Sequence, residues 1–293
     1  MYKISADRPL NPVTLVILNT LQEIAKTYGR GHFLIGATAR DILMTHIFGI
    51  DAGRATRDVD FAIAVEDWAQ FESIKNALIR DGNFQPAVNQ IHRLYFRPDE
   101  FEGAFPLDLI PFGAIEGPGN VIAWPPDMNV LMSVAGYAEA LRTAIPVEVG
   151  DDIVVNVVSI PALAALKLLA WHERGLDDDK DAQDFYFLTK NYYRAGNETR
   201  LFEEARAVLE STGFDLALAG AVLLGYDTKL ALDASTREAL FHVLGDPRKR
   251  DRLIIHMDKS IAANSSVTQS YLEAFERGFS LASPNEFLPA DAA

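Results

Sequence analysis

Apolar and polar residues alternate between Val59 and Val65, and this period of two predicts a β-strand. Residues two apart in an extended chain point to the same side, so the apolar members share one face. These members are Val59, Phe61, Ile63 and Val65. Asp58 and Asp60 share the other face with two alanines, and that face is otherwise small and open. The strand therefore presents two neighbouring carboxylates.

A second apolar segment, His32–Ile35, precedes Gly36, and the residues from Ala37 to Phe48 have helical spacing. Backbone N–H groups at the start of a helix have no partner within the helix and lie at the positive end of its dipole. The turn from Gly36 to Thr38 could therefore hold triphosphate oxygens, and glycine permits their close approach. An ordinary strand-to-helix turn is the alternative, which is weaker here because an acidic strand follows.

A third acid, Asp108, interrupts the alternating apolar residues of Phe105–Ile110, which predict another strand. An unpaired charge in such a strand would be costly, so the carboxylate needs a partner. A metal ion is one such partner. Pairing with an arginine is equally compatible, because Arg93 and Arg97 lie on a further plausible strand, Ile91–Arg97.

Neighbouring carboxylates repel each other unless a cation lies between them or water reaches both. Mg²⁺ prefers oxygen ligands and combines one or two carboxylates with substrate phosphates. Two such ions about 3.5 to 4 Å apart serve in-line displacement at phosphorus. We therefore predict that Asp58, Asp60 and Asp108 bind Mg²⁺ or Mn²⁺ beside a nucleoside triphosphate. For the Asp-x-Asp pair taken alone, a solvated strand end is the commoner explanation.

Strands alternate with helices in the first half of the chain, which predicts an α/β fold. We expect helices at Pro12–Tyr28 and Asp67–Asp81, a Pro/Gly-rich loop at Pro111–Pro126, and strands at Ala144–Val149 and Ile153–Val158. From Ser159 onward the spacing is helical. The later helices are expected at Leu201–Leu209, Phe214–Leu224, Thr236–Leu244, Pro247–His256 and Val267–Phe279. The chain should thus consist of a mixed domain over residues 1–158 and a helical bundle over residues 159–293.

Lys167 stands out in the segment from Ile160 to Trp171, a helix that is apolar on nearly every side. Such helices are usually buried, so the ammonium must extend to the surface, meet a carboxylate or bind a ligand phosphate. Ser159 could cap this helix, and Pro161 suits its first turn. The residues favour phosphate binding and surface extension equally.

Composition excludes several functions and leaves others open. The chain has 293 residues and no cysteine, which excludes disulfides, cysteine-ligated zinc and thiol catalysis. There is no His-Glu-x-x-His pattern, Walker loop or Gly-x-Ser-x-Gly elbow. No apolar stretch approaches the length of a membrane span, and no leader is evident, so we expect a cytoplasmic protein with no membrane partner.

The net charge of −14 argues against broad binding of nucleic acid, because like charges repel. Local basic patches can still matter. Six arginines gather in the first hundred residues: Arg30, Arg40, Arg54, Arg57, Arg93 and Arg97. We predict Arg40 and Arg57 as nucleotide contacts, with pairing to Asp41 or another local acid as the alternative for Arg40.

With these features in place, the chain resembles the nucleotidyltransferase superfamily and, within it, the AbiEii/AbiGii-type toxin nucleotidyltransferases. The resemblance extends over roughly residues 30 to 190. It is carried by Gly36–Asp41, Arg54–Phe61, Asp108–Gly113, Lys167–Arg174 and Lys180–Asp184. The family usually places serine directly after the glycine, whereas this chain has Ala37, for which Thr38 is the nearest substitute.

The resemblance implies a mixed sheet with flanking helices and a C-terminal helical bundle. It also implies transfer of a nucleoside monophosphate from an NTP to an acceptor hydroxyl, with Mg²⁺ or Mn²⁺. Asp58, Asp60 and Asp108 would be catalytic and Gly36, Ala37 and Thr38 would hold the nucleotide. A lysine on one helix and an aspartate on the next are functional in such enzymes, which implies Lys167 with Asp181 or Asp184.

The family further implies a toxin of a toxin–antitoxin or phage-defence system, acting on the acceptor end of tRNA and neutralised by a cognate antitoxin protein. A small-molecule nucleotidyltransferase of the aminoglycoside-modifying kind is the alternative enzyme, because an acidic cleft would suit a cationic acceptor. A catalytically inactive nucleotide-binding module is the third hypothesis, which Ala37 makes worth testing.

Overall fold

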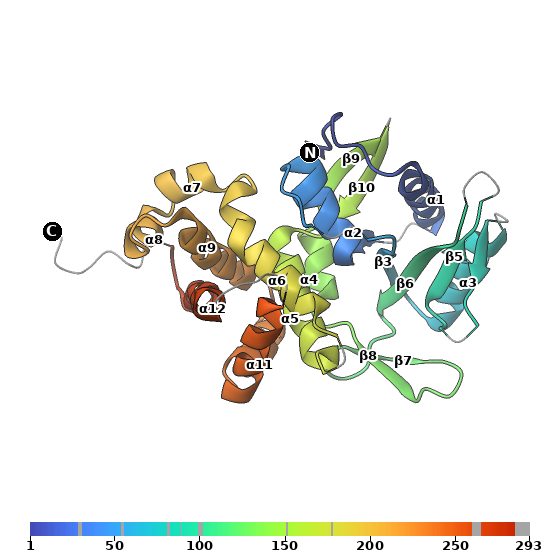
Figure 1. Cartoon of the computed structure of the whole chain (residues 1–293). Coiled ribbons are helices and arrows are strands. Elements are labelled where there is room, and N and C mark those ends of the chain that lie inside the picture. Colours follow the sequence, from blue (N-terminus) through green and yellow to red (C-terminus); the bar gives the residue numbers. More distant parts are fainter. Residues whose placement is uncertain are drawn as a thin grey trace. The chain divides into compact units, whose positions relative to one another are not determined.

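The computed structural model describes residues 1–28, 31–53, 56–80, 83–88, 90–98, 102–150, 152–176, 178–259 and 265–284. The chain divides into two compact units, Met1–Ser159 and Ile160–Ala293. This division lies one residue from the domain boundary predicted after residue 158. Figure 1 shows strands in the first unit and helices throughout the second.

An eight-stranded mixed sheet forms the centre of the first unit, in the order β1-β9-β10-β2-β3-β6-β5-β4. Its strands are β1 (Tyr2–Lys3), β9 (Ile145–Gly150), β10 (Ile153–Val157), β2 (His32–Ile35), β3 (Val59–Val65), β6 (Phe105–Gly113), β5 (Arg93–Phe96) and β4 (Phe84–Pro86). β3 lies antiparallel to β2 and parallel to β6. β7 (Val121–Trp124) and β8 (Val130–Ser133) form a separate antiparallel pair.

β3 has the alternation that its sequence predicts. Val59, Phe61, Ile63 and Val65 are all buried, whereas Asp60 and Ala64 on the other side are half-buried. The strand lies in the middle of the sheet, so its apolar face gains most from burial. The α/β prediction is therefore confirmed, with a mixed sheet and flanking helices.

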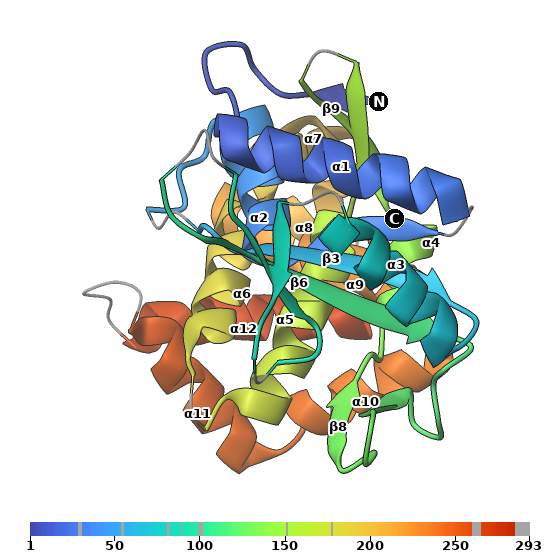
Figure 2. The same cartoon turned by 90° about the vertical axis from the view of Figure 1, so that its right-hand side faces the viewer.

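Two helices pack beside each other on the sheet, α1 (Pro12–Tyr28) and α3 (Trp68–Arg80). The Tyr28 hydroxyl joins them by donating to the carbonyl of Ser73 at 3.1 Å, and Figure 2 shows both helices in front of the strands. The short helix α4 (Tyr137–Arg142) instead contributes Tyr137, whose ring packs against Phe33 of β2 and Phe112 of β6.

The predicted helix after Gly36 is present, but its second half is wound differently. α2 (Gly36–Asp41) continues directly into a π-helix at Ile42–Ile47. π-helical turns are rare, and the hydrophobic spacing of a short segment does not distinguish them from an α-helix. The predicted bounds of Ala37 to Phe48 are nonetheless within one residue of the observed segment.

The prediction of a loop over Pro111–Pro126 is partly wrong, because β6 continues to Gly113 and β7 lies within the range. A proline inside a central strand normally removes a ladder hydrogen bond. Here β5 pairs with β6 only as far as Asp108, and the Leu109 N–H reaches past it to the carbonyl of His92. Pro111 has its nitrogen on that same side of β6, beyond the end of β5, so no strand hydrogen bond is lost.

The second unit is helical in its described part. Its helices are α5 (Ile160–Arg174), α6 (Lys180–Asn191), α7 (Glu198–Glu203), α8 (Arg206–Ser211), α9 (Leu216–Ala231), α10 (Ala234–Leu244), α11 (Pro247–Asp258) and α12 (Ser265–Ser280). The single helix predicted over Leu201–Leu209 is wrong. The carbonyl of Arg200 accepts from both Glu204 and Ala205 N–H, which closes α7 before α8 begins.

α9 and α12 form the closest helix pair of this unit, and they lie side by side in Figure 1. Glycines bring the two backbones together: a Cβ at Gly225 would lie 2.0 Å from the carbonyl oxygen of Phe275. A Cβ at Gly278 would lie 1.8 Å from that of Val222. Among the described residues, no helix combines the length and apolarity that crossing a membrane requires.

Candidate nucleotidyl-transfer site

Asp60 and Asp108 are direct neighbours in the parallel register of β3 and β6. Asp58 lies on the same side of the chain as Asp60, one residue before β3 begins. All three are half-buried. The three acids predicted from the sequence therefore come from adjoining segments, at the start of β3 and in the part of β6 that pairs with it, and Figure 1 shows these two strands next to each other.

The turn at Gly36 touches this acidic end directly. Ile35 pairs with Asp60 across β2 and β3, which brings the next residue, Gly36, against the carboxylate. Gly36 has φ of +69°, and a Cβ there would lie 1.9 Å from Asp60 Oδ2. Only glycine allows both this left-handed conformation and the contact. Sequence reasoning thus identified a turn and an acid that the fold brings together.

Thr38 ties the same turn to the preceding segment. Its hydroxyl donates to the backbone carbonyl of Asp58 at 2.5 Å, and its side chain is buried. A hydroxyl has one proton to donate, so this proton is not directed at a ligand. Ala37 has no side-chain donor. The donors that the turn offers to phosphate oxygens are consequently the backbone N–H groups at the start of α2.

Arg93 holds the third acid. Its Nε and Nη2 donate to Asp108 Oδ1 and Oδ2, both at 2.6 Å, and the two residues face each other across β5 and β6. These bonds, together with the charges of Asp108 and Asp58, raise the pKa of Arg93 further despite its partial burial. His92 Nε2 lies 3.9 Å from Asp108 Oδ1, but burial lowers the pKa of this histidine. The arginine partner considered for Asp108 is therefore the one present.

The residues at this site fit a divalent cation in part. In the described part of the chain, no three His, Asp or Glu side chains are grouped closely enough to hold a metal ion. At Asp108, both carboxylate oxygens accept from Arg93. Asp58 and Asp60 supply the hard oxygen donors that Mg²⁺ and Mn²⁺ prefer. Asp108 would join them only after its bonds to Arg93 are exchanged.

The two arginines predicted as nucleotide contacts differ in their surroundings. Arg40 donates to Asp41 Oδ1 through Nε at 2.8 Å and Nη2 at 2.6 Å, which is the alternative considered for it. Arg57 is exposed, directly before Asp58. Arg30 and Arg54 lie outside the described residues.

The second unit contains its own cluster of charges. Lys167 of α5 is only 7% exposed, and its ammonium lies 3.0 Å from Asp181 Oδ1 and 2.7 Å from Asp184 Oδ2, both on α6. Arg174 Nε donates to Asp181 Oδ2 at 2.8 Å. The ammonium of Lys167 therefore pairs with carboxylates and does not extend to the surface. It contacts both Asp181 and Asp184, the two alternatives that the sequence left open.

Charge pairing outweighs burial in this cluster. Burial alone would lower the pKa of Lys167, but Asp184 and Asp181 raise it above its ordinary value. Burial would likewise raise the pKa of Asp181, but Lys167 and Arg174 lower it. Lys167 and Asp181 are therefore charged near neutral pH.

Arg174 is the member that sequence reasoning did not assign. It lies seven residues after Lys167, which puts both on one face of α5. Asp181 and Asp184 are three apart and share a face of α6. These two spacings together were the signal that could have identified it.

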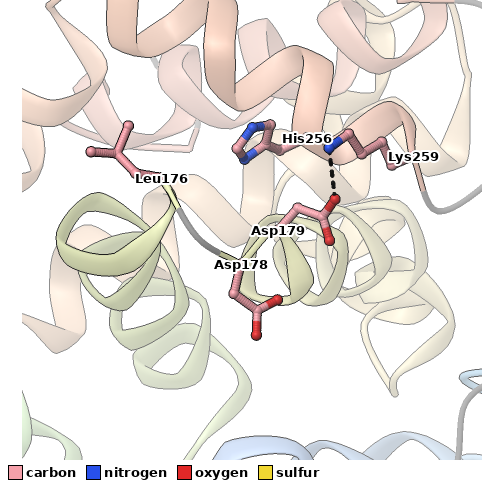
Figure 3. A pocket seen from close by; sticks show the side chains of 5 residues that line it. All are labelled: Leu176, Asp178, Asp179, His256 and Lys259. Carbon is pink, nitrogen blue, oxygen red and sulfur yellow. Dashed lines mark ion pairs between the residues drawn. The ribbon is translucent and has the colours of Figure 1, made fainter.

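A shallow pocket in the same unit involves none of the predicted site residues. It is lined by Leu176, Asp178, Asp179, His256 and Lys259. Lys259 Nζ pairs with Asp179 Oδ2 at 3.0 Å across its rim, as Figure 3 shows. Two carboxylates in its wall make it unsuited to a phosphate group.

Comparison with known proteins decides the family. Residues 24–254 match the model of the family described as nucleotidyl transferase AbiEii toxin, type IV TA system. The chain belongs to this family. It is accordingly a nucleotidyltransferase, and the matched range includes the Gly36 turn, the three acids and the Lys167 cluster. No curated protein is similar enough to the chain to count as a match.

Solved structures resemble this AbiEii-family chain distantly. An antigenic nucleotidyltransferase-like protein from Paracoccidioides brasiliensis has a TM-score of 0.42 and 15% identity, covering 71% of this chain and 93% of its own. The antibiotic-resistance factor ANT(2'')-Ia has a TM-score of 0.35 and 13% identity, covering 70% and 98%. The Thermotoga maritima CCA-adding enzyme complexed with tRNA has a TM-score of 0.26 and 11% identity, covering 94% and 81%. These likenesses are too distant to indicate a substrate.

Proposed function

We propose that this AbiEii-family nucleotidyltransferase moves a nucleoside monophosphate from an NTP to an acceptor hydroxyl at the acidic end of β3 and β6, with pyrophosphate leaving. The contact of Gly36 with Asp60 carries this proposal, because it joins a phosphate-binding turn to a carboxylate. The register of Asp60 with Asp108 supports it.

Each residue has a role that its position supports. Backbone N–H groups from Gly36 to Thr38 bind the triphosphate, and Asp58 and Asp60 hold a divalent cation. Such a cation, when bound, neutralises charge on the phosphate oxygens. Once its bonds to Arg93 are exchanged, Asp108 completes the cation site and assists removal of the acceptor proton. Arg57 is exposed beside these acids and pairs with phosphate oxygens.

Lys167, Asp181 and Asp184 are proposed as a second functional set on the helical unit. Lys167 supplies a permanent positive charge, and the two aspartates keep it protonated and fixed. Because both carboxylates already pair with this ammonium, it would stabilise developing negative charge on a phosphate only after one of these contacts is exchanged.

The acceptor we propose is the 3′ end of tRNA, and the biological role is that of a toxin neutralised by a cognate antitoxin protein. The family description names a toxin of a type IV system, which supports the role. A hydroxyl at an RNA end is the kind of nucleophile that the predicted chemistry requires.

The deciding experiment follows transfer of label from each α-³²P NTP, with Mg²⁺ or Mn²⁺, onto total tRNA. The wild-type chain is compared with the Asp58→Ala, Asp60→Ala double variant. We expect labelled RNA from one or more NTPs and none from the double variant.

Three other outcomes would redirect the proposal. Label that persists in the double variant would remove Asp58 and Asp60 from the site. No label with either protein, while calorimetry detects NTP binding, would favour an inactive nucleotide-binding module. Transfer to an aminoglycoside in place of RNA would favour the small-molecule enzyme.

A further inference from the structure

Positive charge gathers at the start of α11 in a chain whose net charge is −14. Arg248, Lys249, Arg250 and Arg252 all lie within its first six residues. Arg250 is neutralised, because it pairs with Glu276 at 3.0 Å and with Glu273 at 3.3 Å. The remaining three cations are available to form a local basic surface.

Arg252 lies over the ring of Trp171, the guanidinium carbon 4.8 Å from the ring centroid. The ring covers one face of the guanidinium and offers no hydrogen-bond acceptor in its plane. Arg252 Nε is buried and, within the described part of the chain, has no hydrogen-bond partner. Stacking on Trp171 therefore orients the guanidinium of Arg252, while its Nε–H still has no hydrogen-bond acceptor among the described residues.

His172 follows Trp171 and shows the same deficit. Its Nδ1 is buried and lacks a partner among the described residues. Burial, then Lys249 and Arg252, lower the pKa of His172, and only Asp246 opposes them. The imidazole thus lies in a field that positive charge dominates.

Asp246 raises the pKa of His172 against this field, and its oxygens are already engaged. Its Oδ1 accepts from the backbone N–H of Arg248 and of Lys249, which caps α11. Its Oδ2 lies 4.0 Å from Lys249 Nζ, at the limit of an ion pair. Asp246 and Asp251 are the acids of this stretch, against Arg248, Lys249 and Arg252.

Buried polar groups without a partner are rare in folded proteins, and each calls for an explanation such as an external ligand. Here two of them, His172 Nδ1 and Arg252 Nε, occur in one basic region with Lys249 and the exposed Arg248. We infer that Lys249 and Arg252, with His172 beside them as a hydrogen-bonding group, form a basic cluster that binds a backbone phosphate of an RNA. This inference rests on the proposed function in naming RNA as the source of the phosphate.

The position of the cluster favours a phosphate of a long chain over a small free anion. A pocket lies around His256, whose Nδ1 accepts from Trp171 Nε1 at 3.1 Å, and Asp178 and Asp179 line that pocket (Figure 3). Beside it on α11, Arg248 is exposed, and Lys249 and Arg252 are half-buried. An open surface with spaced cations follows a polyanion and holds a single ion poorly.

The test measures binding of fluorescently labelled tRNA to the full chain by anisotropy across a salt series, without NTP or metal. The variant is Lys249→Gln with Arg252→Gln. Its matched control is Lys180→Gln with Arg206→Gln, which removes the same two charge types from exposed ion pairs in the same unit. We expect the variant to lose about tenfold in affinity and about one in the slope of log Kd against log salt, with the control unchanged.

Several results would overturn the inference. Equal affinity and slope in the variant and the wild type would remove the cluster from RNA binding. Equal losses of RNA affinity in the control variant would show that the effect comes from net charge and not from this cluster. If calorimetry finds tight binding of inorganic phosphate that the variant loses while RNA binding is unchanged, the cluster is a site for a free anion. Melting curves of both double variants exclude misfolding, and the single variants Arg252→Gln and His172→Gln replace the double variant if it unfolds.

The metal-site variant separates this inference from the proposed function. Asp58→Ala with Asp60→Ala should bind tRNA as the wild type does, because the cluster lies on the other unit. Absence of label transfer in the wild type, with RNA binding that still depends on Arg252, would reject the proposed reaction and retain the cluster. Label transfer by the wild type, with RNA binding unchanged in the Lys249→Gln, Arg252→Gln variant, would retain the proposed reaction and reject the cluster.

Discussion

Arg93 donates to both carboxylate oxygens of Asp108, and the same aspartate lies beside Asp60 in the register of β3 and β6. The guanidinium of Arg93 therefore binds the same Asp108 oxygens that a divalent cation would use as ligands. Neighbouring carboxylates need positive charge nearby, and an arginine can supply it when no metal is bound. Arg93 and a divalent cation should thus compete for Asp108.

Replacing Arg93 with Gln should strengthen metal binding several-fold, because Asp108 then becomes available beside Asp60 while the repulsion between the two acids rises. The measurement is Mn²⁺ binding by electron paramagnetic resonance, which does not depend on turnover. Arg97→Gln is the control, since Arg97 lies over the Tyr95 ring at 5.8 Å on the same segment. Weaker or equal Mn²⁺ binding by the Arg93 variant would mean that Asp108 is not a metal ligand.

Local sequence patterns predicted the individual strands and helices of this site. They could not predict which of these elements pair with each other. The alternation around Phe61 and the glycine before α2 are features of single segments, and both predictions are confirmed. The register that puts Asp60 beside Asp108 joins residues 48 positions apart in the sequence, and it depends on the whole sheet. For the same reason the sequence left the partner of Asp108 open between a metal and an arginine.

Elements that depend on their neighbours were also mispredicted. Pro111 indicated a loop, but the end of β5 leaves its nitrogen without a required partner, so β6 continues through it. Lys167 showed no preference between a phosphate and the surface, because its two acids lie on the following helix. In both cases the conformation or the contact depends on a neighbouring segment: β5 for Pro111 and α6 for Lys167.

Replacing Gly36 with Ala should destabilise the first unit and disturb the acid site together. The left-handed backbone costs about 1–2 kcal/mol for a residue with a Cβ. The new Cβ would also lie 1.9 Å from Asp60 Oδ2, so the carboxylate must move. Gly119→Ala is a matched control, because φ is +75° there and nothing lies within 4 Å of an added Cβ. Urea unfolding and NMP transfer should both suffer more in the Gly36 variant; equal losses in stability with full transfer activity would show that the contact with Asp60 is unimportant.

Replacing Thr38 with Val should lower kcat and leave KM for the NTP nearly unchanged. Its hydroxyl donates to the Asp58 carbonyl, so its loss frees the segment that carries the first acid. A hydrogen bond of this kind contributes about 0.5–1.5 kcal/mol, and unfolding should shift by a similar amount. Thr38→Ser keeps the hydroxyl and should behave as the wild type. A rise in KM with kcat unchanged would instead assign Thr38 to phosphate binding.

Replacing Lys167 with Met should cost about 3–5 kcal/mol of unfolding free energy, because two buried carboxylates then lose their shared cation. Arg174→Met removes a cation from the same Asp181, but the Arg174 side chain is 62% exposed. Water screens a pair whose cation is exposed, and such a pair contributes about 0–1 kcal/mol, so this variant should be close to the wild type. Urea unfolding compares the two, and adding Asp184→Asn to the Lys167 variant should recover part of the loss. Similar stabilities for both single variants would contradict the burial of the cluster.

The charges of this cluster also predict how stability depends on pH. The pKa of Asp181 is lowered from 3.8, so its contribution is present above that value and is lost as pH falls through the lower pKa of the folded state. The pKa of Lys167 is raised from 10.5, so its contribution is present below that value and is lost as pH rises through the higher folded pKa. Stability from the cluster should therefore be constant between these limits and fall outside them. Urea unfolding of the wild type and of Asp181→Asn across the acid range tests this: the difference between them should shrink below pH 3.8, and a difference that persists unchanged at lower pH would show that the Asp181 charge contributes nothing.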